Sequence, residues 1–95
     1  MSDVIKSIYV TIMGDLTDIG YCEFCVEGAD KLGLTGWIRD RRDGVVEAIF
    51  HGRDDRLHKM IDMCSEGPEG TRIDRILATP CNPPNVAGFI RRPTY

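Results

Sequence analysis

Residues 34–51, LTGWIRDRRDGVVEAIFH, decide the fold because they hold two strand patterns around a tight turn. Asp43-Gly44 is the strongest short hairpin signal in the chain, since glycine readily adopts the positive φ that such turns require. After the turn, Val46, Ala48 and Phe50 alternate with residues that face the other way, a period typical of a strand with one face in a core. The segment therefore predicts a hairpin of two strands, over residues 34–40 and 45–51.

A strand, a loop and a helix are predicted before this hairpin. Apolar residues alternate over Ile8–Met13, which indicates a strand, and glycines bound the loop that follows over residues 14–20. From Tyr21 the apolar spacing becomes helical. Gly33 followed by Leu34 is typical of the C-terminus of such a helix.

A second helix and two further strands are predicted after the hairpin. The helix covers residues 54–66, and a strand over residues 71–79 follows it. The spacing of three between Ile73 and Ile76 predicts a β-bulge in that strand, and a short last strand covers residues 88–90. The order β-α-β-β-α-β with one extra strand predicts an α+β, ferredoxin-like (split βαβ) sandwich, in which an antiparallel sheet of about five strands carries two helices on one face.

Length, charge and cysteine content limit the function classes. Ninety-five residues suffice for one domain with a core, so we expect a single domain over residues 1–95. A net charge of −3 and a pI of about 5.2 argue against nucleic acid or an anionic membrane as a partner. No stretch approaches the roughly 20 apolar residues that span a bilayer, and the N-terminus lacks a signal-peptide pattern. We therefore expect four reduced cysteines in a cytoplasmic monomer.

Several short strings resemble one family of enzymes. LGLTGWIR at residues 32–39 is followed by DGVVE at residues 43–47, then by Gly52, Gly67-Pro68 and Gly88-Phe89. Together they resemble the acylphosphatase family, with matching spacing from about residue 8 to residue 90. The resemblance implies the ferredoxin-like fold and the hydrolysis of acyl phosphates to a carboxylate and phosphate. It also implies that no metal or organic cofactor takes part.

The resemblance implies a site with three parts. A loop of the form GxVQGVGFR wraps its backbone N–H groups around the phosphate, and its last arginine, at the start of the first helix, neutralises phosphate charge. An asparagine after the second strand orients the attacking water. In this chain the loop is GDLTDIGYC at residues 14–22, so the arginine position is Cys22 and the asparagine position is Asp40. The expected phosphate-loop residues are Asp15, Leu16, Thr17, Asp18, Ile19 and Gly20.

Both catalytic positions, Cys22 and Asp40, thus carry substituted side chains, and the predicted cradle contains acid. Asp15 and Asp18 lie in the loop, and Asp40 faces its mouth. Two like charges about 4 Å apart repel by roughly 4 kcal/mol at an effective dielectric constant of 20. We therefore expect a small anionic ligand to be held poorly, acyl phosphate hydrolysis to be weak or lost, and a binding or regulatory role to remain.

Three arginines near Asp40 are candidates to replace the missing cation. Strand alternation places Arg39 on the side opposite to Asp40. Arg41 and Arg42 lie in the hairpin, where we expect a solvated face with Asp40 and Asp43. Rescue by any of the three is not expected.

Two alternatives remain open. The chain is then either an active acyl phosphate hydrolase that recruits Cys22 or Asp40, or a redox or metal protein that uses Cys22 and Cys25. The second alternative rests on a C-x-x-C motif at a helix start, which lowers thiol pKa values in redox proteins. Against it, Cys25 fits a core position, neighbouring acids raise thiol pKa values, and no second motif completes a zinc site, so no metal is expected.

Overall fold

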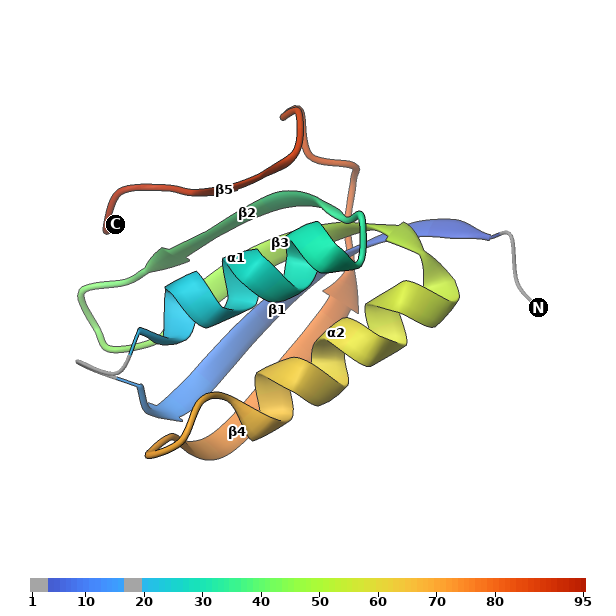
Figure 1. The fold of residues 1–95 in the computed structure, drawn as a ribbon. Coiled ribbons are helices and arrows are strands. Elements are labelled where there is room, and N and C mark those ends of the chain that lie inside the picture. The colour runs from blue at the N-terminus through green and yellow to red at the C-terminus, as the bar shows by residue number, and fades with distance from the viewer. Residues whose placement is uncertain (1–3, 17–19) are drawn as a thin grey trace.

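The computed structural model describes residues 4–16 and 20–95, and it confirms the α+β, ferredoxin-like fold. Its strands form one sheet in the order β4-β1-β3-β2-β5, and both helices cover the same face of it (Figure 1). The elements are β1 (Ile5–Asp15), α1 (Tyr21–Lys31), β2 (Thr35–Asp40), β3 (Val46–Arg53), α2 (Asp54–Glu66), β4 (Arg72–Pro80) and β5 (Phe89–Arg91).

The predicted hairpin forms between β2 and β3. These strands pair antiparallel with Ile38 opposite Ala48, and Gly44 in the turn adopts a φ of 88°. The turn closes with the Arg41 N–H donating to the Val45 carbonyl at 2.8 Å. This register places the alternating apolar residues of β3 on the helix-covered face, where Phe50 is fully buried.

The core lies between the sheet and the two helices. The ring of Phe50 stacks on that of Phe89 with centroids 5.2 Å apart, which ties β3 to β5 beneath α1. Burial of each large apolar side chain contributes about 1.5–3 kcal/mol to folding. The first helix ends as predicted: Gly33 has a φ of 67°, and the Leu34 N–H donates to the Ala29 carbonyl at 2.9 Å.

The end of β1 differs from the prediction, because the strand continues through Gly14 and Asp15 instead of entering a loop. Gly14 pairs with Ile73 and Asp15 with Arg72. The apolar alternation stops at Met13, but backbone pairing needs no apolar side chain. The register shifts between Met13 and Gly14, which confirms a bulge in β4. A Cβ on Gly14 would lie 2.0 Å from the Arg72 carbonyl oxygen, so glycine permits this close approach.

The last strand pairs parallel with β2, so the sheet is antiparallel only from β4 to β2. Beyond β5 the chain stays on the same edge. The Arg92 N–H donates to the Ile38 carbonyl at 2.8 Å, and the Tyr95 N–H donates to the Asp40 carbonyl at 2.9 Å. The C-terminal residues therefore reach the β2–β3 turn (Figure 1). No helix within residues 4–16 and 20–95 is long and apolar enough to cross a membrane.

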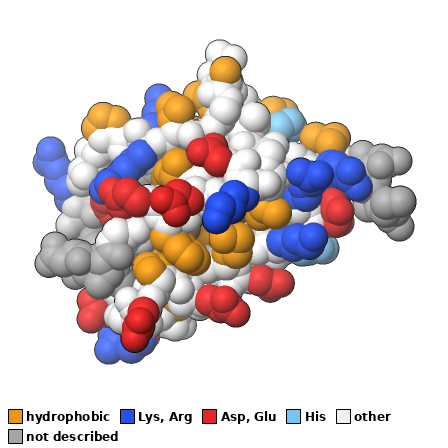
Figure 2. Space-filling model, viewed as in Figure 1, with side chains coloured by type: hydrophobic (Ala, Val, Ile, Leu, Met, Phe, Trp, Pro, Cys, Tyr) orange, Lys and Arg blue, Asp and Glu red, His pale blue; other side chains and the backbone are white. Residues whose placement is uncertain are grey.

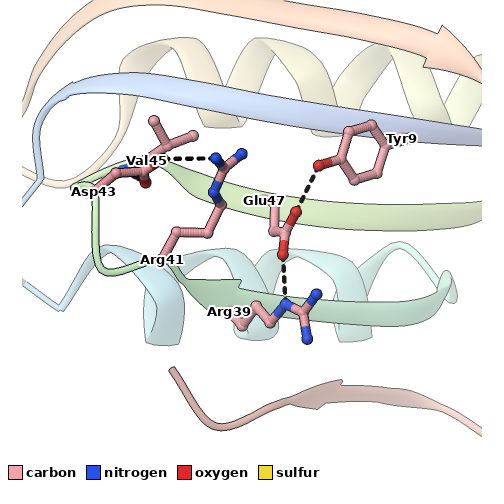
Figure 3. Close-up of polar contacts among 6 residues, drawn as sticks. All are labelled: Tyr9, Arg39, Arg41, Asp43, Val45 and Glu47. Carbon is pink, nitrogen blue, oxygen red and sulfur yellow. Dashed lines mark hydrogen bonds and ion pairs between the residues drawn. The ribbon is translucent and has the colours of Figure 1, made fainter. Parts of the chain in front are cut away.

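A polar cluster lies on the sheet face opposite to the helices (Figure 3). The Glu47 carboxylate accepts hydrogen bonds from the Tyr9 hydroxyl and from Arg39 Nε, each at 2.5 Å. The Arg39 guanidinium also lies 4.8 Å from the Trp37 ring centroid and 4.2 Å from that of Tyr95. Burial alone would raise the pKa of Glu47, but the hydrogen bonds from Tyr9 and Arg39 outweigh it and lower that pKa.

Substitution of this carboxylate should cost stability in a pH-dependent way. We expect Glu47→Gln to lower the free energy of unfolding by about 1–3 kcal/mol at pH 7. Because the folded-state pKa of Glu47 lies below 4.5, the stabilisation is fully present above pH 4.5 and is lost as the pH falls through the folded-state value. Urea unfolding at pH 7 and at pH 3 measures both effects, with exposed Glu69→Gln as the control. If Glu47→Gln lowers the free energy of unfolding by the same amount at pH 7 and at pH 3, the stabilisation does not come from the ionised Glu47 carboxylate.

Candidate functional site

A pocket of about 500 Å³ opens where α1 begins. We call it the α1 pocket, and its walls come from the first turn of α1, the end of β2 with the following turn, and the segment around β5. The lining residues are Leu16, Gly20, Tyr21, Cys22, Glu23, Asp40, Arg41, Gly44, Arg91 and Thr94. The structure therefore brings together the two substituted positions, Cys22 and Asp40, which lie far apart in the sequence.

The first turn of α1 supplies backbone donors to this pocket. Gly20 precedes the helix in the left-handed conformation, with a φ of 68°, and its carbonyl accepts the Phe24 N–H at 3.0 Å. The first N–H groups of a helix have no partner inside it, and the N-cap residue, Gly20, makes no side-chain hydrogen bond to them. The partial positive charge of a helix N-terminus favours an anion. From Gly20 onwards the backbone therefore offers N–H donors of the kind that the predicted cradle needs.

Cys22 adds no charge to the pocket. Only 3% of this residue is exposed. Burial raises the pKa of its thiol to about 12, and the negative charge of Asp40 adds to the rise. The thiol is therefore neutral at pH 7, at the position where the family pattern has an arginine.

A cation that the sequence did not predict, Arg91, places its guanidinium at the α1 pocket between two carboxylates. Its guanidinium donates through Nη1 to the Glu23 carboxylate and through Nη2 to Asp40 Oδ2, the latter at 2.9 Å. Figure 2 shows acidic and basic side chains side by side at the end of the molecule where α1 begins. One signal could have found Arg91: it follows Phe89, a core residue, by two positions and so shares its face of the sheet.

The three arginines that were considered lie elsewhere or are engaged. Arg39 lies on the opposite face with Glu47, as alternation predicted. Arg41 lines the pocket, but its Nη2 donates to Asp43 Oδ2 at 2.6 Å. The predicted solvated face is therefore right for Asp43 and wrong for Asp40, because Asp40 pairs with Arg91. Arg42 lies in the turn, and its N–H donates to the Tyr95 carbonyl.

Among the described residues, the acid in the α1 pocket comes from outside the predicted loop. Asp15 ends β1, is exposed, and is not among the described residues that line the pocket. Leu16 is buried and does line it. Thr17, Asp18 and Ile19 of the expected phosphate loop lie outside the described residues. Among the described side chains, Glu23 and Asp40 supply the carboxylates, and one guanidinium is shared between them.

The two cysteines of the C-x-x-C motif occupy different environments. Cys22 lines the pocket, whereas Cys25 is fully buried in the core and its Sγ lies 4.0 Å from that of Cys64 on α2. The contact with the Cys64 thiol and burial raise the pKa of Cys25 far above the ordinary value. Within the described part of the chain, no group of three or more His, Cys, Asp or Glu side chains is arranged to hold a metal ion.

Comparison with known proteins agrees with this fold. Residues 8–90 match the family model described as Acylphosphatase. The chain is 39% identical to an acylphosphatase of Rhodospirillum rubrum over 94% of this chain and 98% of the relative. It is 38% identical to acylphosphatase 2 of Ralstonia nicotianae over 99% of each. The solved structure of an acylphosphatase from Coxiella burnetii superposes with a TM-score of 0.88, at 24% identity over 93% of each chain. With the family model, the fold and these relatives in agreement, the chain belongs to the acylphosphatase family.

Proposed function

We propose that the α1 pocket binds the phosphate end of small acyl phosphates weakly, and that hydrolysis is much slower than in family members with the arginine and the asparagine. The domain then has a binding or regulatory role. The observation that carries this proposal is the engagement of Arg91 by both Glu23 and Asp40. The pocket has no excess positive charge to offer a phosphate dianion.

The chemistry of the reaction explains why these substitutions matter. Water adds its oxygen to phosphorus while the bond between phosphorus and the acyl oxygen breaks, which yields a carboxylate and phosphate. The protein performs little covalent chemistry in phosphoryl transfer, so charge stabilisation and positioning supply most of the rate. Removal of one charge-stabilising donor commonly lowers the rate about 10²–10³-fold. A neutral, buried thiol at Cys22 supplies neither charge nor a strong donor.

The aspartate at the second catalytic position, Asp40, also opposes phosphate binding and turnover. An asparagine both donates to and accepts from a water molecule, whereas an ionised aspartate only accepts. One Asp40 oxygen already accepts from Arg91. A phosphate about 4 Å from this carboxylate would meet a repulsion of roughly 4 kcal/mol at an effective dielectric constant of 20. Two substitutions thus oppose binding and turnover together.

A second candidate is an active hydrolase with an altered site. The presence of Arg91 in the α1 pocket favours it, because a guanidinium matches phosphate oxygens in geometry and charge. The ion pairs that hold Arg91 are exposed, and exposed pairs contribute only about 0–1 kcal/mol. Curated relatives over nearly the full length of this chain are named acylphosphatase. In this case Asp40 would accept a proton from the attacking water.

A redox or metal role for Cys22 and Cys25 has less support. A reactive thiol needs a lowered pKa, whereas burial raises the pKa values of both residues. Cys25 instead contacts Cys64 in the core.

Restoration of the two family side chains tests the proposed function. We expect Cys22→Arg combined with Asp40→Asn to raise kcat/KM for acetyl phosphate at least 10²-fold over the parent, because the cation and the water-orienting amide return. Release of acetate and phosphate between pH 5 and pH 8 measures the rate. The matched control, Cys81→Arg with exposed Asp62→Asn, makes the same chemical changes outside the pocket and should leave the rate unchanged. Parent turnover equal to that of the double variant would select the active hydrolase instead.

Thiol labelling tests the electrostatics of the pocket. Because the pKa of Cys22 is raised to about 12, we expect iodoacetamide to modify it only slowly between pH 7 and pH 9, and more slowly than the partly exposed Cys81. Asp40→Asn should increase the rate at Cys22, since it removes a charge that opposes the thiolate. Peptide mass spectrometry after timed labelling gives the rate at each cysteine. Rapid labelling of Cys22 at pH 7 would support the redox alternative.

A further inference from the structure

We infer that Arg91 is the phosphate-binding cation of the α1 pocket, so that the arginine of this site is supplied by the last strand instead of by the start of the first helix. The inference rests on the proposed function, namely that the pocket takes a phosphate group. Arg91 then contacts the ligand directly. Glu23 and Asp40 are carboxylates of the pocket itself that compete with the phosphate for the Arg91 guanidinium.

The position of Arg91 supports this role. Its guanidinium contacts Glu23 in the first turn of α1 and Asp40 at the end of β2. Glu23 adjoins the position from which the family pattern draws its arginine, and Asp40 is the position of its asparagine. The positive charge of Arg91 partly offsets the rise in the pKa of Cys22, so this charge acts at the substituted position. A guanidinium here is therefore near both parts of the expected site.

The backbone around Arg91 fixes the direction of its side chain. Parallel pairing aligns Arg91 with Ile38, a fully buried residue of β2, so both lie on the helix-covered face. The next residue, Arg92, faces the other way, with its guanidinium 5.4 Å from the Trp37 ring centroid. Its backbone N–H donates to the Ile38 carbonyl and keeps this segment on the edge of β2. Two adjacent arginines thus lie on opposite faces of the sheet.

Arg91 can exchange its partners. Its side chain is 45% exposed, and those of Glu23 and Asp40 are 58% and 40% exposed. Exposed ion pairs contribute little to stability, so their disruption does not unfold the domain. A phosphate offers two oxygens in the geometry that the guanidinium fork prefers. Phosphate binding must then displace the two carboxylates, which explains why affinity in the parent is expected to be low.

Titration with inorganic phosphate, followed through amide chemical shifts of residues 20–23, tests the inference without any need for turnover. We expect Arg91→Gln to raise the Kd about tenfold, because a charged hydrogen bond to the ligand is lost. Arg92→Gln is the matched control, with the same change one residue away on the opposite face, and should alter the Kd less than twofold. Glu23→Gln should lower the Kd several-fold, since it removes one competing anion. Cys22→Arg should restore phosphate binding in the Arg91→Gln background.

The possible outcomes separate the inference from the proposed function. Equal weakening by Arg91→Gln and Arg92→Gln would show a general charge effect and overturn the inference. If Arg91→Gln binds phosphate like the parent, the inference is wrong and the proposed function survives. If no variant binds phosphate, including Cys22→Arg with Asp40→Asn, the proposed function fails and the inference with it. If Arg91→Gln does not fold, two other variants take its place. Arg91→Lys keeps the charge but loses the planar guanidinium, and Glu23→Gln leaves Arg91 intact. An unchanged Kd for phosphate in both variants would overturn the inference.

Discussion

The antiparallel pairing of β2 with β3 is the constraint on which the rest of the structure depends. It places Phe50 in the core, Arg39 beside Glu47 on the open face, and Asp40 at the α1 pocket. A slip of one residue would move every one of these side chains to the opposite face, because side chains alternate along a strand. The tight turn at Gly44 fixes this register locally, and the buried face of β3 fixes it globally.

Most of the fold could be predicted because its signals are short in range. The turn at Asp43-Gly44, the helix end at Gly33 and the bulge near Ile73 each follow from a few neighbouring residues. The parallel pairing of β5 could not be predicted in this way. It joins segments that are some fifty residues apart, and an edge strand of three residues is too short to show an apolar pattern. The extension of β1 through Asp15 was missed for a related reason, since backbone pairing continues where the apolar alternation ends.

The candidate site was likewise predictable where it depends on local motifs and not where it depends on the pairing of distant strands. The positions of Cys22 and Asp40 at one pocket followed from motif spacing, and the structure brings both residues there. The source of the charge did not follow, because Glu23 and Arg91 meet only through the pairing of β5 with β2. Of the three acids predicted for this site, Asp40 lines the pocket, Asp15 does not, and Asp18 lies outside the described residues. The other described carboxylate of the pocket is Glu23 of α1. A pocket whose cation is already neutralised by its own carboxylates is a weaker anion site than its backbone suggests.

The short edge strand β5 has a consequence for the order in which this domain loses structure. Edge strands with few partners open at a lower free energy than the core does, in local fluctuations that leave the remaining sheet paired. Detachment of β5 from β2 would withdraw Arg91, while β1, β3 and β4 keep their antiparallel partners. The pocket would then retain Glu23 and Asp40 without their cation. The charge of the site is therefore tied to a three-residue edge strand, and local opening of that strand would make the pocket more negative before the core unfolds.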